Sequence, residues 1–235
     1  IMNQEYMKKL SEDPEIQHKI SKSQCKIDLT MALFNPEVNN QPSNPLVNGS
    51  QIRNLHLISS SLEVGPIANM IQNKASNLEN LDLVLYNIPN EDSLTNLQSI
   101  GNLSSLKQFS FDMSYGKSEH LVEVMQNLKL PANLRELNMN FEYYREEHIK
   151  EALDAPFFSQ MKSLKKLNSF TFVLYTILYA DSTLLQFLKE VIKSLNPGLK
   201  HLNFLCCTGE NFPCIDSDLI SLILNRFPNL ETLQL

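Results

Sequence analysis

The residues best suited to chemistry in this sequence are three cysteines near its C-terminal end. Cys206, Cys207 and Cys214 lie close enough in sequence to suggest a soft metal site. Tetrahedral zinc takes four ligands, however, and adjacent side chains on a strand point to opposite faces. The fourth cysteine, Cys25, is far away in sequence. We therefore expect no bound metal, and we expect these cysteines to act as small hydrophobic residues.

Patterns typical of catalysis are missing. The five histidines have no histidine partner three or four residues away, and each is expected at the surface or on a strand: His18, His56, His120, His148 and His201. The six glycines form no G-x-G pair, which loops that cradle phosphate need. G-x-S-x-G and H-E-x-x-H motifs are also absent. We therefore expect that the protein is not an enzyme, has no cofactor and takes no small-molecule substrate.

A short run of carboxylates has a structural explanation. Glu146, Glu147 and Glu151 fall where a helix is expected to begin, beside Lys150. Negative charge near a helix N-terminus is favourable in itself, because the backbone dipoles leave partial positive charge there. These carboxylates therefore need no catalytic role.

Composition narrows the class of protein further. The chain has 235 residues, 43% of them hydrophobic and 20% charged, with a formal net charge of −6. An acidic chain of this size can bury a core but lacks the basic face that nucleic-acid binding needs. Four cysteines are too few for a disulfide framework, and no apolar run reaches the length of a membrane span. We expect a cytoplasmic protein with no membrane insertion and no nucleic-acid partner, and association with the cytoskeleton stays open as an alternative.

The strongest signal is a repeated apolar triplet of the form L-x-x-L-x-L, with large aliphatic residues or Phe allowed. Its first residues fall at positions 52, 78, 106, 134, 167, 199 and 230, so neighbouring triplets are 26 to 33 residues apart. The triplets are Ile52-Leu55-Leu57, Leu78-Leu81-Leu83, Leu106-Phe109-Phe111, Leu134-Leu137-Met139, Leu167-Phe170-Phe172, Leu199-Leu202-Phe204 and Leu230-Leu233-Leu235. The fifth has a second frame that starts at Leu164, which predicts an insertion or a bulge there. Each triplet predicts a short strand.

Between the triplets the apolar spacing changes to that of a helix. One expected helical face carries Leu121, Val124, Met125 and Leu128, a second carries Leu184, Leu185, Leu188, Val191, Ile192 and Leu195, and a third carries Leu219, Ile220, Ile223, Leu224 and Phe227. Ser118, Asp181-Ser182 and Asp216 are expected to cap these helices. A unit of one strand and one helix cannot bury its own apolar face, so neighbouring units must stack.

This pattern resembles the leucine-rich repeat proteins, and the unit length is similar to the ribonuclease-inhibitor-like or cysteine-containing subclass. The resemblance implies an α/β solenoid of about seven repeats, with a curved parallel sheet on the concave face and helices on the convex face. Ile27 and Leu29 precede Leu55 and Leu57 by 28 residues and extend the pattern backwards.

The sequence departs from that family at one position. Three residues after each triplet the family usually places Asn or Cys, whereas this chain has Ser60, Tyr86, Ser114, Glu142, Tyr175 and Cys207. Only Cys207 fits, so the repeats are degenerate.

Two regions follow from the pattern. Residues 1–50 are expected to form an N-terminal helical segment over residues 3–23 and an Asn/Pro-rich loop over residues 35–50, as a degenerate repeat or a cap. Residues 51–235 are expected to form the repeat domain. Because the sequence stops at Leu235 in the middle of the pattern, we expect the domain to continue beyond it in a longer protein.

A binding surface can be read from the triplets, because side chains on a strand alternate between two faces. The residue between the last two core positions should face outward on the concave side: His56, Asp82, Ser110, Asn138, Thr171, Asn203 and Gln234. A second outward column is Asn54, Asn80, Gln108, Glu136, Ser169, His201 and Thr232. Just beyond the triplets, Val84, Val173 and Leu205 should face the same way, alongside Asp112 and Asn140.

These observations favour a non-enzymatic interaction module or scaffold that binds another protein, or a multi-subunit complex, through its concave face. In that interpretation the partner-binding surface consists of His56, Asp82, Ser110, Asn138, Thr171 and Asn203, together with the apolar Val84, Val173 and Leu205. Two alternatives stay open. One is the repeat region of a GTPase activator, although the regular Asn-x-Ile-Gly turns of that class are missing. The other is the substrate-receiving part of a ubiquitin-ligase adaptor, although residues 1–50 supply no convincing F-box-like segment.

Overall fold

The computed structural model of the chain describes residues 27–33, 52–59, 77–85, 96–113, 120–142, 146–176, 182–208 and 215–235. The expected helix over residues 3–23 and the Asn/Pro-rich loop over residues 35–50 lie outside these ranges, as do Ser118 and Cys214.

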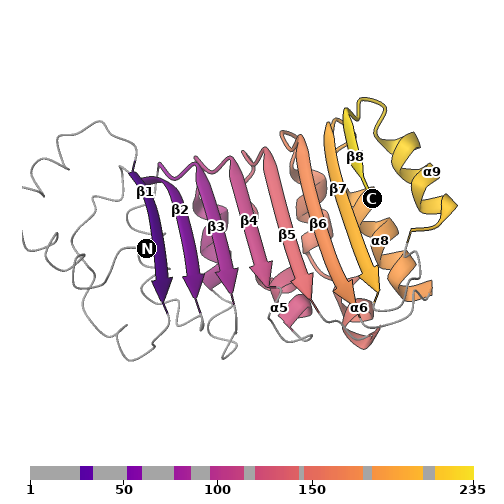
Figure 1. Cartoon of the computed structure of the whole chain (residues 1–235), viewed down its shortest axis with the longest axis horizontal. Coiled ribbons are helices and arrows are strands. Elements are labelled where there is room, and N and C mark those ends of the chain that lie inside the picture. The colour runs from indigo at the N-terminus through magenta and orange to yellow at the C-terminus, as the bar shows by residue number, and fades with distance from the viewer. Residues whose placement is uncertain are drawn as a thin grey trace, which may run out of the picture.

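The described residues form an α/β fold built on one sheet of eight parallel strands (Figure 1). The strands lie side by side in sequence order, from the N-terminal to the C-terminal end of the sheet. They are β1 Ile27–Leu33, β2 Ile52–Ser59, β3 Asn80–Leu85, β4 Gln108–Met113, β5 Glu136–Glu142, β6 Ser169–Thr176, β7 His201–Thr208 and β8 Thr232–Gln234. Each strand therefore pairs with the strands before and after it in the chain, an arrangement consistent with a solenoid.

The register of the sheet agrees with the triplets. Leu55 pairs with Leu81, Leu81 with Phe109, and Phe109 with Leu137. The same alignment continues through Phe170 and Leu202 to Leu233. Along β3 burial alternates residue by residue, with Leu81, Leu83 and Leu85 buried and their neighbours half-buried. The prediction of strands with one apolar face is confirmed.

The first strand corrects the expected start of the pattern. Leu29 pairs with Leu55 and Met31 with Leu57, so the alignment of Ile27 with Leu55 was wrong by two residues. The register shifts between Ile27 and Asp28, and this irregularity is invisible to a count of residues between apolar positions. Part of residues 1–50 thus belongs to the same sheet as residues 51–235.

From β3 to β8, the described helices lie between consecutive strands in the chain and on one side of the sheet (Figure 1). In chain order they are the 3-10 helix η3 Asn96–Asn102, α5 His120–Asn127, α6 Glu146–Ala152, α7 Phe157–Ser163, α8 Ser182–Ser194 and α9 Ser217–Arg226. Three of these match the expected helical faces. The side chain of Asp216 caps α9 as predicted, accepting a hydrogen bond from the backbone N–H of Leu219 at 2.7 Å.

Burial corrects the expected helical faces in detail. Leu121, Val124, Met125 and Leu128 are all buried. In α8, Leu185 is only half-buried, and Phe187 takes the place in the core instead. In α9, Ile220 is 36% exposed and Leu224 is 59% exposed, because no described helix packs against that side of α9. Apolar side chains of the last triplet are exposed as well: Leu233 is 37% exposed and Leu235 is 42% exposed.

Phenylalanine fills the space between the sheet and the helices. Phe172 lies at the centre of this cluster, with ring centroids 5.9 Å from Phe141, 6.1 Å from Phe187 and 5.6 Å from Phe204. All four rings are fully buried, and they come from β5, β6, β7 and α8. Aromatic pairs at this separation add packing energy beyond the area they bury. The cluster therefore joins β5, β6, β7 and α8 into one core.

The turn that enters each strand repeats along the chain. The backbone N–H of the first triplet residue donates to the carbonyl three residues earlier, at 3.0 to 3.2 Å, in Leu106, Leu134, Leu167, Leu199 and Leu230. The second frame at Leu164 is explained by this turn, because Leu164 accepts the hydrogen bond from Leu167. The long spacing in that unit comes from the additional helix α7, so the expected insertion is found and the bulge is not.

Side chains also tie each unit to the one before it. Gln160, which is in α7, donates to the carbonyl of Leu128 at 2.9 Å and accepts from the N–H of Leu130 at 3.0 Å. Arg226, at the end of α9, donates to the carbonyls of Ile192 and Leu195 at 3.1 and 2.9 Å. Carbonyls at a helix C-terminus have no partner inside the helix, so these side chains satisfy them from the next unit.

The stacked core predicts a regional response to a buried charge. Leu137→Asp places a carboxylate at a fully buried position between Phe109 and Phe170, and should cost several kcal/mol of folding free energy. Because stacked units contact mainly their neighbours, protection against hydrogen exchange should fall first in β4, β5 and β6. The control Leu224→Asp, at a 59% exposed position, should change stability by less than about 1 kcal/mol. A uniform loss of protection along the chain would contradict this prediction.

A second prediction concerns Gly101, where the backbone closely approaches Lys129 of the following unit. A Cβ atom at this position would lie 2.7 Å from the Cβ of Lys129, an atom that cannot move without its backbone. Gly101→Ala should therefore cost about 1–3 kcal/mol. At Gly198 the nearest atom to an added Cβ is 3.5 Å away, so Gly198→Ala should be neutral or slightly stabilising. Chemical denaturation of both variants measures the difference, and equal effects would contradict it.

Candidate binding surface

The side of the sheet opposite the helices carries the residues that the sequence predicts to face outward. We call this side the open face, because no described helix lies in front of it in Figure 1. It is made of three columns of side chains that run across the strands in register. The first is Asn54, Asn80, Gln108, Glu136, Ser169, His201 and Thr232; the second is His56, Asp82, Ser110, Asn138, Thr171, Asn203 and Gln234; the third is Ile58, Val84, Asp112, Asn140, Val173 and Leu205.

All nine residues predicted as partner-binding positions lie on the open face. Their side chains are half-buried, and the strand residues next to them are buried except Cys206, which is itself half-buried. The first two columns form continuous lines across the sheet from β2 to β8, as the triplet alignment predicts. Strands lie about 4.8 Å apart, so side chains that are distant in sequence become neighbours.

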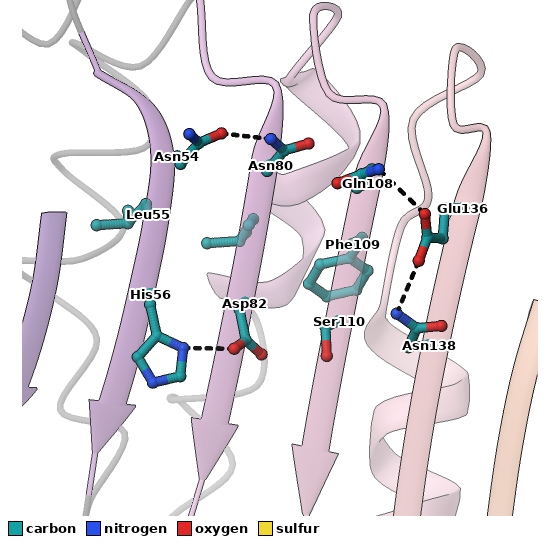
Figure 2. Close-up of a pocket in the computed structure, with 11 residues that line it drawn as sticks. Asn54, Leu55, His56, Asn80, Asp82, Gln108, Phe109, Ser110, Glu136 and Asn138 are labelled. Carbon is teal, nitrogen blue, oxygen red and sulfur yellow. Dashed lines mark hydrogen bonds and ion pairs between the residues drawn. The ribbon is translucent and has the colours of Figure 1, made fainter. Parts of the chain in front are cut away.

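A groove occupies the open face over β2, β3, β4 and β5, with a cavity volume of about 360 Å³ (Figure 2). Its polar lining comes from the first two columns: Asn54, His56, Asn80, Asp82, Gln108, Ser110, Glu136 and Asn138. The inward-facing Leu55, Leu81 and Phe109 complete the lining. The groove therefore presents hydrogen-bonding groups above an apolar core.

Neighbouring strands exchange hydrogen bonds within the groove, as the dashed lines in Figure 2 show. The side-chain amide of Asn80 donates to Asn54, and the imidazole Nδ1 of His56 contacts the carboxylate of Asp82.

Glu136 joins two amides on the far side of the groove. It accepts from Gln108 Nε2 at 3.0 Å and from Asn138 Nδ2 at 3.4 Å. The contact with His56 orients the carboxylate of Asp82, and the contacts with Gln108 and Asn138 orient that of Glu136.

The order of residues in the second column bears on catalysis. A Ser-His-Asp triad needs the imidazole between the hydroxyl and the carboxylate. Here Asp82 lies between His56 and Ser110, and the strands that carry His56 and Ser110 are two steps apart, roughly 10 Å. The imidazole is therefore too far from Ser110 to take its proton, so these three residues do not form such a triad.

The third column is apolar at its ends and polar in the middle. Val84, Val173 and Leu205 are half-buried, and Ile58 on β2 belongs with them. Between them, Asn140 Nδ2 donates to Asp112 Oδ2 at 3.1 Å. The buried Oδ1 atoms of Asn140 and, in the second column, Asn203 accept no hydrogen bond from the described residues.

A fourth column, at the entrance to the strands, is charged. It runs Arg53, Glu79, Lys107, Arg135, Asn168, Lys200 and Glu231, and we call it the charged rim. Glu79 forms ion pairs with Arg53 at 3.2 Å and with Lys107 at 2.7 Å, and Lys200 pairs with Glu231 at 2.6 Å. From Glu79 to Lys200, each backbone carbonyl of the rim also accepts two N–H groups of the following strand, at 2.7 to 3.1 Å.

Sequence reasoning missed the charged rim, although the signal was present. Every member is the residue directly after the first apolar residue of a triplet, so the alignment that predicts the other columns also gives this one. The amide–carboxylate contacts of the groove had no such signal, because they depend on side-chain conformation.

The remaining candidate residues are the cysteines and the carboxylates of α6. No group of three or more His, Cys, Asp and Glu side chains there could hold a metal ion. Cys206 is partly buried and packs against the core, while the Cys207 side chain and Cys214 lie outside the described set. Glu146 and Glu147 begin α6 as expected.

None of the described helices is long and apolar enough to cross a membrane.

Comparison of the chain with protein-family models and with curated proteins finds no match. The candidate surface is therefore defined by the register of the sheet, the groove and the charges around it.

The charged rim yields a prediction about pH. The hydrogen bond and charge of Lys200, with a smaller contribution from His201, hold the pKa of Glu231 below its ordinary value of 4.5, although desolvation opposes this. A lowered carboxylate pKa favours the folded state above the ordinary value, and this contribution is lost as the pH falls through the lowered pKa. Lys200→Met should therefore raise the pKa of Glu231, as measured by NMR titration of its carboxyl carbon.

The matched control is Lys193→Met. Lys193 is as exposed as Lys200 and pairs with Glu190 on α8 at 2.7 Å. It should leave the pKa of Glu231 unchanged. An equal rise in both variants would mean that net charge, and not the local ion pair, sets this pKa.

Proposed function

We propose that this chain is a leucine-rich repeat solenoid that acts as a non-enzymatic protein-interaction module, with its open face as the concave binding surface. The observation that carries the proposal is the open face itself. It presents polar columns in strict register, together with a groove, on the side of the sheet away from the helices.

Three features support this proposal. The strands follow sequence order and each pairs with its neighbours, which is how repeat units stack into an extended surface. The recurring turn hydrogen bonds support a repeated unit despite its degenerate sequence. Half-buried Val84, Val173 and Leu205 add apolar area beside hydrogen-bonding groups, the mixture that protein interfaces use.

The proposal extends to the kind of partner. A surface that spans several strands fits another protein or a multi-subunit complex better than a small molecule. The absence of Lys and Arg from the three columns argues against a nucleic acid, whose phosphates need cations. We propose a cytoplasmic setting for this interaction.

The proposal is tested with a variant that changes three positions of the second column. Asp82→Arg, Asn138→Arg and Asn203→Arg together place long cationic side chains on β3, β5 and β7 and should abolish binding of a partner that uses the open face. The measurement is affinity purification of the tagged protein from its native cells with quantitative mass spectrometry. Partners that depend on the open face should fall at least tenfold, about 1.4 kcal/mol.

The matched control places the same charges on the helical side. Gln126→Arg, Glu151→Arg and Gln186→Arg lie at exposed positions of α5, α6 and α8 and change the net charge by the same amount. Partners lost from the first variant and kept by the control support the proposal. Partners kept by both variants, or lost equally from both, would overturn it.

A further inference from the structure

Charge is distributed unevenly between the open face and the rest of the molecule. The chain contains 20 Lys and Arg residues, yet none occurs in the three columns of the open face from β2 to β8. The same columns contain Asp82, Asp112 and Glu136, which lie on β3, β4 and β5. The open face is therefore an acidic surface at its N-terminal half.

The two carboxylates that line the groove are balanced by no strong cation. Asp82 contacts the imidazole of His56, and Glu136 accepts from the neutral amides of Gln108 and Asn138. Within the described residues, neither carboxylate forms an ion pair with Lys or Arg. This contrasts with Glu79 on the charged rim, which pairs with two cations.

The geometry suits a cationic group that enters between them. Asp82 and Glu136 are two strands apart and offset by two residues along the strands, roughly 12 Å between their backbones, with Gln108 and Ser110 of β4 between them in the lining of the groove. A guanidinium or ammonium group above β4 would lie within reach of both carboxylates. The contacts of Glu136 with Gln108 and Asn138 hold its oxygens in place, which reduces the entropy lost on binding.

We propose that the groove over β2–β5 binds a basic segment of a partner protein, with Lys or Arg side chains placed between Asp82 and Glu136. This inference rests on the proposed function and names the chemistry of the partner. Charge-assisted hydrogen bonds to carboxylates are the strongest available here, and Arg can form two at once. The apolar third column then flanks the basic contact with Val84 and Ile58.

The test uses the full chain and synthetic peptides of defined charge. The probe is an acetylated, amidated octapeptide of alternating Arg and Gly, compared with Gln-Gly and Glu-Gly peptides of equal length. Fluorescence anisotropy at physiological salt measures affinity. The variant Asp82→Asn with Glu136→Gln removes both charges and nearly preserves shape, and it should weaken binding of the basic peptide about tenfold. Circular dichroism verifies that the variant is folded.

The matched control is Glu151→Gln with Asp154→Asn, two exposed carboxylates on the helical side. It changes the net charge equally, so it should leave the affinity unchanged. Equal weakening by both double variants would overturn the proposal by indicating general attraction to an acidic protein. Failure of the basic peptide to bind better than the Gln-Gly peptide would also overturn it.

The same variants separate this inference from the proposed function. Suppose that a native partner is lost from the triple Arg variant but kept by Asp82→Asn with Glu136→Gln. The open face then binds its partner without the basic contact, and only the further inference fails. A partner kept by both would overturn the proposed function as well.

Discussion

The structure depends on one constraint: each strand has a single apolar face, and that face can be buried only with the help of neighbouring strands and helices. A strand with Leu and Phe at every second position gains stability only if helices cover that side and adjacent strands continue it. Phe172 shows how this is met, since its ring contacts residues from the strands before and after it and from α8. Where that continuation stops among the described elements, apolar side chains such as Leu224 stay exposed.

The same stacking determines the other side of the sheet. Because inward residues are held in register by their packing, outward residues are aligned into columns whether or not they interact. Side chains from units about 30 residues apart thereby lie one strand spacing from each other. This is why His56 contacts Asp82 and Gln108 contacts Glu136, and why a groove with an ordered polar lining forms on an otherwise regular sheet.

Charge then distinguishes regions of this surface. On the charged rim, opposite charges neutralise each other within the molecule and help to join adjacent units. In the groove, carboxylates are held by amides and an imidazole, so their charge stays available to a partner. Exposed ion pairs contribute little to stability, which makes the rim a minor part of the folding energy. In the interaction that we propose, the carboxylates of the groove matter more, because they would steer and select an oppositely charged partner.

The linear pattern of apolar residues was enough to predict the strands, their register from β2 to β8 and the outward columns. A period of two along each strand and a spacing of 26 to 33 residues between strands are properties of the linear chain. The register of β1, the core position of Phe187, the exposure of Ile220 and the pairing of Glu136 with two amides emerged only from the folded molecule. These depend on which surfaces meet in space and which side-chain conformations their packing allows, and neither is encoded in the spacing of residues.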